Sequence, residues 1–287
     1  MSSLAQPWRA RRYRAPDVTP LEVWNLPVLG HELWELLSTP RVEADRREGV
    51  PEARLAHRLM PGLVSAVESL VLRHAADAVW LTGGLLCLRD FRPALEEAAR
   101  ELRCPVHLAE SPRYAPVLAG LHVFPASVTQ PWVLDVGQTS VKCVSQHAPP
   151  RVFERDVTAL PRLFIGMPRP SDGHHIQAAV RFIASALQSF ARDTGASAPD
   201  GLCLALPCPV DDALRPGGCT YGWEGHTSLV HDLLEQAHLP GGGDVLVLND
   251  AELSAEAARR EPRLANHTRI LCLTLGFGPG GALLERG

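Results

Sequence analysis

Short apolar runs alternate with amphipathic stretches along this chain of 287 residues. That alternation is typical of an α/β protein, because a buried strand needs apolar residues in succession, whereas a helix on a sheet needs them every three or four positions. The fold class is therefore predicted as α/β. The clearest strands are expected at residues 78–81, 132–136, 202–206, 245–248 and 270–275.

Three amphipathic stretches are expected to be helices. Apolar residues at positions 176, 180, 183, 187 and 190 follow helical spacing, with Ser171 as the expected N-cap. A second helix is expected after Gly49, kinked or interrupted at Pro61, and a third over residues 92–103. The proline-rich stretch at 149–170 and the glycines at 241–243 are expected to be surface loops.

The chain is long enough for two lobes that each bury a core. Its net charge of −4 gives no reason to expect nucleic acid or an anionic membrane as a partner. No apolar run reaches the roughly 18 residues that a membrane span needs, and the basic N-terminus lacks the apolar core of a signal peptide. The seven cysteines are scattered, without a CxC or CxxC pair, which indicates buried thiols in a reducing compartment. We therefore expect a cytoplasmic protein.

A strand that ends near Asp135 turns through Gly137 and runs back over Lys142, which predicts a tight hairpin. Glycine lets the backbone approach a phosphate, Thr139 offers a hydroxyl, and the Asp135 carboxylate can hold Mg²⁺ through water. Lys142 is the only lysine in the chain. The alternative is structural, because a strand-end aspartate is commonly a turn former.

A second strand pair is interrupted by glycine at positions 276, 278, 280 and 281, so its backbone N–H groups are also expected to face a phosphate. Between the two turns, Asn249 and Asp250 follow a third apolar strand. A lone aspartate there would be interpreted as the cap of the following helix. Beside two phosphate-type turns, Asp250 is predicted to be catalytic or to bind substrate.

These segments resemble the ROK family (repressors, open reading frames and sugar kinases) of the actin/hexokinase/Hsp70 fold. DVGQT at 135–139 matches its DxGxT phosphate-1 motif, NDA at 249–251 its NDA motif, and TLGFGPGG at 274–281 its phosphate-2 stretch. PCPVD at 207–211 is similar to PGPVD, YGWEG at 221–225 to the WxGxxL segment, TGG at 82–84 to the adenosine-side glycines, and LGHE at 29–32 to ELGH. The order is rotated, because the segments expected last lie at 29–32 and 78–110. We interpret the rotation as a circular permutation of a protein similar to the polyphosphate/ATP glucokinase branch.

The resemblance implies a two-lobed actin-like ATPase (ribonuclease H-like) fold, circularly permuted, with a nucleotide in the cleft between the lobes. The large lobe would hold residues 1–115 and 263–287, and the small lobe residues 116–262. The new termini would lie at one hairpin, with Gly287 beside residues 7–13. The implied activity is ATP-dependent phosphorylation of a hydroxyl on a hexose or a sugar-like cyclitol, with Mg²⁺. Inorganic polyphosphate is the alternative donor, and a homodimer would fit the family.

The resemblance also implies residue roles. Asp250 would be the catalytic base, Asp135 would hold the metal, and Asn249, His31 and Glu32 would bind the sugar. For His31 the alternative is a hydrogen-bonded core residue. The residues implied to bind the nucleotide are Asp135, Gly137, Gln138, Thr139, Lys142, Gly83, Gly84, Gly276 and Gly278.

The chain departs from the family pattern at several of these positions. Gln138 replaces the second glycine of DxGGT, and Phe277 and Pro279 replace a threonine and a small residue of phosphate-2. Cys208 replaces the glycine of PGPVD, and Val28 replaces the glutamate of ELGH. These departures favour an alternative function, a non-catalytic regulator that binds a sugar or a nucleotide. A DNA-binding repressor is not expected, because the sequence contains no additional helix-turn-helix segment.

Overall fold

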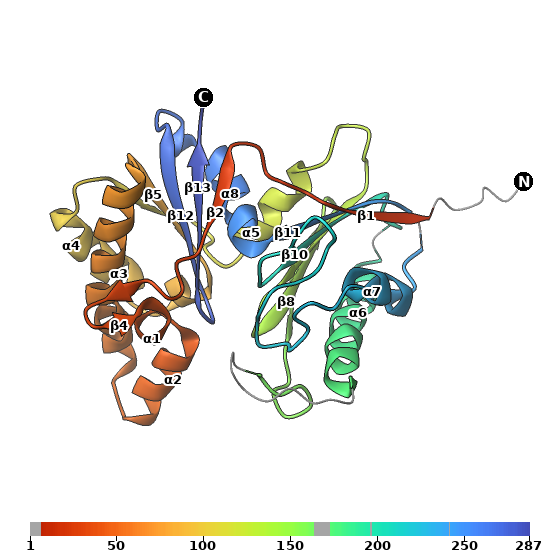
Figure 1. Cartoon of the computed structure of the whole chain (residues 1–287), viewed down its shortest axis with the longest axis horizontal. Coiled ribbons are helices and arrows are strands. Elements are labelled where there is room, and N and C mark those ends of the chain that lie inside the picture. The colour runs from red at the N-terminus through yellow and green to blue at the C-terminus, as the bar shows by residue number, and fades with distance from the viewer. Residues whose placement is uncertain (1–6, 164–172, 196, 241) are drawn as a thin grey trace, which may run out of the picture. The chain divides into compact units, whose positions relative to one another are not determined.

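The fold is mixed α/β and is divided into two compact units. A computed structural model describes residues 7–163, 173–195, 197–240 and 242–287 (Figure 1). Unit 1 holds the described residues up to Arg14 together with Gly120–Asp250, and unit 2 holds Ala15–Ala119 and Ala251–Gly287. The predicted division at 116–262 differs from this at three places. Residues 7–14 lie in unit 1, and residues 116–119 and 251–262 lie in unit 2. The alanines of 251–262 pack against Trp80 and Cys272 of unit 2.

Unit 1 is built on one mixed sheet. Its strand order is β1-β11-β10-β7-β8-β9, with β1, β11, β10 and β7 parallel and β8 and β9 added antiparallel. Strands β7 and β10 are buried along their whole length, which explains their continuous apolar sequences. The elements are β1 (Trp8–Arg12), η3 (Gly120–His122), β7 (Pro131–Val136), β8 (Ser140–Ser145), β9 (Ala148–Glu154), α6 (His174–Thr194), β10 (Gly201–Leu206), α7 (Leu229–Ala237) and β11 (Gly243–Asn249).

Helix α6 packs its apolar face on this sheet, with Phe190 edge-on to Trp132 at 5.1 Å between ring centroids. The N-cap of α6 is Gly173, and the predicted cap Ser171 lies outside the described residues. The prediction of a loop over residues 149–170 is wrong for residues 149–154, which belong to β9, and residues 164–170 lie outside the described residues. Strand β9 lies at the sheet edge, where Pro149 and Pro150 remove no ladder hydrogen bond that the sheet requires.

Unit 2 is built on a second mixed sheet with the order β2-β13-β12-β5-β6. The long helix α3 supplies much of its core and continues through Pro61, which was expected to kink or interrupt it. The elements are β2 (Val18–Leu21), β3 (Pro27–Val28), β4 (His31–Glu32), α1 (Leu33–Leu36), α2 (Thr39–Arg47), α3 (Glu52–His74), β5 (Ala78–Thr82), η1 (Gly84–Cys87), α4 (Phe91–Ala98), η2 (Ala99–Glu101), β6 (Val106–Leu108), α5 (Ala115–Ala119), α8 (Asp250–Arg260), η4 (Pro262–Leu264), β12 (Arg269–Leu275) and β13 (Pro279–Glu285).

Helix α3 is long and apolar enough to cross a membrane by length and composition. Half of its most apolar stretch is buried inside the protein, where Leu55, Leu59 and Leu63 belong to the core of unit 2. Packing in the core therefore accounts for the apolar residues of α3. A cytoplasmic location is compatible with this arrangement and stays a prediction.

The two sheets share one arrangement of five strands. In unit 1, three antiparallel strands β9-β8-β7 are followed by the parallel strands β10 and β11. In unit 2, the antiparallel strands β2-β13-β12 are followed by the parallel strands β5 and β6. In unit 1 the five strands follow one another along the chain as β7, β8, β9, β10 and β11. Their counterparts in unit 2 are β12, β13, β2, β5 and β6, so the first two lie near the C-terminus and the third near the N-terminus. Strand β1 is outside this shared arrangement.

The strand beside the C-terminal strand β13 is β2. Val18 is opposite Leu284, and the Glu285 amide donates to the Asp17 carbonyl at 2.8 Å. The prediction that residues 7–13 lie beside the C-terminal end is therefore wrong, because β2 (Val18–Leu21) is the strand beside β13. Residues 8–12 pair with β11 instead, because Trp8 buries its side chain against the core of unit 1.

Candidate functional site

Three predicted site segments of unit 1 follow neighbouring parallel strands. Asp135 is opposite Ala205, and Leu206 is opposite Asn249. The turn after β7, the loop after β10 and Asp250 after β11 therefore leave the sheet at the same carboxyl edge. Neighbouring strands lie about 4.8 Å apart, so the turn after β7 and Asp250 are separated by roughly 10 Å. Open α/β sheets bind ligands at this edge.

Asp135 and Lys142 are cross-strand partners at the root of the first turn. The Lys142 Nζ atom donates to Asp135 Oδ2 at 2.6 Å, and only 15% and 6% of the two side chains are exposed. The other carboxylate oxygen, Oδ1, is buried and has no hydrogen-bond partner among the described residues. A buried, unpartnered carboxylate oxygen is a fitting acceptor for a water bound to Mg²⁺.

Hydrogen bonds to Gly137 and Gln138 hold the turn after β7 in place. The Gly137 amide donates to the Ser140 carbonyl at 2.9 Å, and the Tyr221 hydroxyl donates to the Gly137 carbonyl at 2.8 Å. The Gln138 side chain, predicted to bind the nucleotide, accepts from the Thr220 amide through Oε1 at 3.0 Å. The Gln138 side chain therefore fastens the turn to Thr220.

Arg155 is a buried residue of this site that the sequence interpretation missed. Its side chain donates five hydrogen bonds, to the carbonyls of residues 138, 160, 161 and 220 and to the Thr220 hydroxyl. The guanidinium also lies 4.1 Å from the centre of the Tyr221 ring, and Tyr221 stacks on Trp223. Burial lowers the pKa of Arg155 from its ordinary value and raises the pKa of Tyr221. No local pattern marks Arg155, since its partners lie as far away as residue 220.

Asn249 and Asp250 stand where the third parallel strand passes into a helix. Asn249 Nδ2 donates to the Leu206 carbonyl at 3.4 Å, and the half-buried Asp250 is the first residue of α8. The Cys208 thiol lies nearby: a hydrogen bond with Cys219 raises its pKa most, followed by burial, and the Asp250 charge adds to the effect. The Asp250 carboxylate is therefore close to the loop that follows β10.

A cavity of about 550 Å³ lies beside that loop. The volume is in the range of small-molecule sites. Two proline side chains supply apolar surface, and carboxylates, a guanidinium and a hydroxyl supply polar groups, a combination that suits a ring with many hydroxyls. The cavity is lined by Pro209, Val210, Asp211, Arg215, Pro216, Gly217, Glu224, Gly225 and Thr227.

In unit 2 the structure brings the two predicted glycine turns together. Thr82 at the end of β5 is opposite Thr274 near the end of β12, and these strands are parallel. A Cβ atom built on Gly83 would lie 2.2 Å from the Leu275 carbonyl oxygen. The Gly276 carbonyl accepts from the amide and the hydroxyl of Thr39, both at 3.0 Å, which fixes the turn after β12.

The glycines of these turns differ in what requires them. Gly83 has a φ of +113° and no room for a side chain, so the turn itself explains it. Gly84, Gly276 and Gly278 have no such φ, and a Cβ atom on each would meet no described atom within 4 Å. Their backbone therefore faces open space, as close approach by a phosphate requires.

A Gly83→Ala variant is expected to lose about 2–3 kcal/mol of stability, because the added methyl group meets the Leu275 backbone at a φ unfavourable for alanine. Gly84→Ala is the matched control and is expected to change stability by less than about 1 kcal/mol. Urea denaturation of both variants measures the difference. Equal stability of the two would contradict the assigned conformation of Gly83.

The predicted sugar contacts His31 and Glu32 lie on the β3–β4 hairpin of unit 2 and are exposed. His31 Nδ1 is 3.6 Å from the Glu35 carboxylate, and Glu32 accepts from the Trp34 indole at 2.7 Å. Glu32 and Glu35 also form a capping box for α1. The core alternative for His31 is wrong, because 59% of its side chain is exposed.

Metal binding at the turn after β7 would rest on one carboxylate, that of Asp135. Across the described parts of the chain, no three His, Cys, Asp or Glu residues are grouped to hold a metal ion. Mg²⁺ is commonly bound by one or two carboxylates together with phosphate oxygens, so Asp135 fits that group when a nucleotide supplies the other oxygens.

The comparisons with known proteins add no assignment to this geometry. No protein-family model matches the chain, and no curated protein is significantly similar to it.

Proposed function

We propose that the protein is a sugar kinase that transfers the γ-phosphoryl group of ATP to a hydroxyl of a hexose or sugar-like cyclitol. The observation that carries the proposal is the carboxyl edge of the unit 1 sheet. There the Asp135 turn, the cavity and Asp250 follow three neighbouring parallel strands. A phosphate-type turn, a small-molecule cavity and a carboxylate at one sheet edge are the parts that phosphoryl transfer to a hydroxyl needs.

We further propose that the fold is the two-lobed actin-like ATPase fold in circularly permuted form. The common strand arrangement of both sheets supports this proposal, because that fold consists of two related halves. The position of β2 supports the permutation: it borders β13 in an antiparallel pair that a short turn would join in an unpermuted chain. The permutation would then have opened the chain between Glu285 and Asp17, and residues 1–14 would be an addition to the shared fold.

In this proposal, Asp250 accepts the proton of the attacking hydroxyl, and Asn249 helps to orient the sugar. The cavity beside residues 209–217 holds the ring of the acceptor. Bound Mg-ATP supplies the phosphoryl group and neutralises charge as it is transferred. Asp135 would hold the metal through its free oxygen, and the open backbone at Gly276, Gly278 and Gly84 would take the phosphates.

ATP with Mg²⁺ is expected to raise the melting temperature by roughly 5 °C at a hundredfold excess over its Kd. Asp135→Asn is expected to lose the part of this shift that depends on Mg²⁺, because the amide oxygen is a weaker metal ligand. The measurement is a thermal-shift titration with ATP and polyphosphate, each with and without Mg²⁺. A coupled ADP-release screen over hexoses, amino sugars and cyclitols then identifies the acceptor. Absence of both a shift and ADP release would contradict the proposal.

The second candidate function is a non-catalytic regulator that binds a nucleotide or a sugar. Two contacts favour it: Lys142 neutralises Asp135 at 2.6 Å, and the Gln138 side chain is committed to the Thr220 amide. Both contacts reduce the charge and the free polar groups that the turn at residues 135–139 offers to a metal ion and its phosphates. Nucleotide binding without turnover of any acceptor would identify the regulator, whereas ADP release that depends on an acceptor would identify the kinase.

A further inference from the structure

Strand β1 is an addition to the five strands that both sheets share. Among the described strands it pairs only with β11, in parallel register from Trp8 opposite Gly243 to Arg12 opposite Val247. Side chains alternate along a strand, so Trp8 and Arg12 lie on one face and Arg9 and Arg11 on the other. The face with Trp8 packs on the core of unit 1, whereas Arg9 and Arg11 pair with Asp244 at the surface. Arg12 therefore leaves the strand on the inner face.

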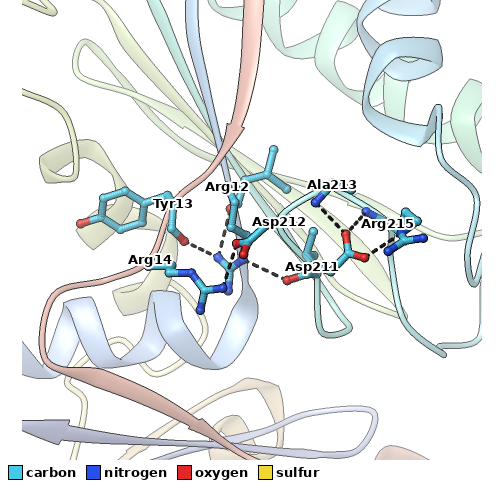
Figure 2. A network of polar contacts seen from close by, with 9 residues as sticks. Arg12, Tyr13, Arg14, Asp211, Asp212, Ala213 and Arg215 are labelled. Carbon is cyan, nitrogen blue, oxygen red and sulfur yellow. Dashed lines mark hydrogen bonds and ion pairs between the residues drawn. The ribbon is translucent and has the colours of Figure 1, made fainter.

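The Arg12 guanidinium joins β1 to two other segments (Figure 2). Nε donates to the Val210 carbonyl at 3.0 Å, and one terminal nitrogen donates to the Val247 carbonyl at 3.1 Å and to the Tyr13 carbonyl. The Tyr13 amide donates to the same Val247 carbonyl at 2.8 Å. Arg12 thus connects the end of β1, the strand β11 and the loop after β10. Figure 2 also shows Arg14 beside Asp212, an exposed pair of 2.8 Å that contributes little by itself.

The loop that Arg12 reaches, residues 209–217, is a closed unit with its own hydrogen bonds. Val210 pairs with Pro216, and the Gly217 amide donates to the Pro209 carbonyl at 2.8 Å. The Asp211 carboxylate accepts from the amides of Ala213 and Arg215 and from the Arg215 side chain, at 2.9, 2.8 and 2.7 Å. These bonds close the loop on itself, and the bond from Arg12 to the Val210 carbonyl ties it to the sheet.

The same loop supplies six of the nine residues that line the 550 Å³ cavity: Pro209, Val210, Asp211, Arg215, Pro216 and Gly217. The atom that Arg12 holds is the carbonyl of Val210, which is itself a lining residue. The position of this cavity wall against Asp250 therefore depends on a contact from a strand far away in sequence.

We propose that Arg12 is a positioning residue of the acceptor cavity: the N-terminal strand β1 clamps the 209–217 loop through the Arg12–Val210 contact. The assignment of the cavity to the acceptor rests on the proposed function, whereas the clamp on the loop does not. Arg12 touches no reacting atom. Its loss leaves the cavity wall less ordered before the acceptor binds, and ordering the wall on binding then lowers the affinity for the acceptor.

The test compares Arg12→Ala and Arg12→Lys with Arg11→Ala in the full chain. Arg11 is the matched control, because it is one position away on the same strand but faces Asp244 at the surface. In hydrogen–deuterium exchange, the amides of residues 211, 213, 215 and 217 are expected to exchange about tenfold faster in Arg12→Ala. They are expected to be unchanged in Arg11→Ala and intermediate in Arg12→Lys, which keeps one cationic donor without the guanidinium fork.

In steady-state kinetics with the acceptor found by screening, Arg12→Ala is expected to raise the acceptor KM by about tenfold or more. The kcat is expected to change by less than about threefold, and the thermal shift with ATP is expected to remain. A purely structural contribution of Arg12 would instead lower the melting temperature and leave the KM of the folded enzyme unchanged.

Unchanged exchange of the loop amides in Arg12→Ala, or equal acceleration in Arg11→Ala, would overturn the clamp. Should Arg12→Ala fail to fold, the exchange and KM of Arg12→Lys decide the question in the same way. The exchange readout needs no catalysis. Faster loop exchange in a protein that phosphorylates no acceptor would therefore retain the clamp and reject the proposed function.

Discussion

An Asp250→Asn variant is expected to lose about 10²–10⁴ in kcat while its melting temperature stays within roughly 3 °C of that of the parent protein. Asparagine is nearly isosteric with aspartate and differs little from it in helix propensity, so the start of α8 is retained. The amide cannot accept a proton, which removes the proposed general base. Acceptor KM is expected to change less than kcat, because the amide still hydrogen-bonds a sugar hydroxyl.

The measurement is kcat, KM and melting temperature on one acceptor for the parent protein, Asp250→Asn and Asp244→Asn. Asp244 is the matched control, because it lies at the other end of the same strand β11 and pairs with surface arginines. Turnover close to that of the parent in Asp250→Asn would reject Asp250 as the base. A large fall in melting temperature would identify Asp250 as a structural cap.

Replacing Arg155 with methionine is expected to lower the free energy of unfolding by about 3–5 kcal/mol, which corresponds to a melting temperature roughly 10 °C lower. The residue is only 6% exposed. Four of its five hydrogen bonds satisfy carbonyl oxygens of four residues, and the fifth goes to the Thr220 hydroxyl. Methionine fills much of the volume but leaves these acceptors unsatisfied. Arg155→Lys is expected to lose nearly as much, because one ammonium group cannot reproduce the planar fork.

Arg151→Lys is the control for this series, because Arg151 is an exposed residue of β9, the strand that Arg155 directly follows. Chemical denaturation of the three variants measures the differences. A loss below about 1 kcal/mol in Arg155→Met would show that water replaces the guanidinium, and would contradict its role as the anchor of the turn at Gly137 and Gln138.

The elements of the fold could largely be predicted from local pattern. The expected strands at 132–136, 202–206, 245–248, 270–275 and 78–81 coincide with β7, β10, β11, β12 and β5. A buried strand requires consecutive apolar residues and a packed helix requires a stripe, and both requirements are met within a few neighbouring residues. The glycine turns after β7 and β12 were visible for the same reason. Strand β9 was missed because its prolines indicate a loop unless the strand is known to lie at an edge.

Local pattern also drew attention to Asp135, Lys142 and Asp250, since each stands beside a strand end or a turn. It did not predict that Lys142 would pair with Asp135, or that the Gln138 side chain would turn inward to Thr220. These contacts depend on which strands become neighbours. Their energies come from partners that meet only in the folded chain.

The sequence by itself therefore determined the α/β class, the positions of most strands and the residue types at the candidate site. Only the tertiary structure decided that residues 8–12 join unit 1 and that β2 borders the C-terminal strand. It also decided that Arg155 donates to the Gln138 carbonyl of the turn and that Arg12 donates to the Val210 carbonyl of the loop. The physical reason is the separation in sequence between the residues that interact. Periodicity and turn chemistry act between near neighbours, whereas strand order and buried guanidinium contacts join residues up to more than 260 positions apart.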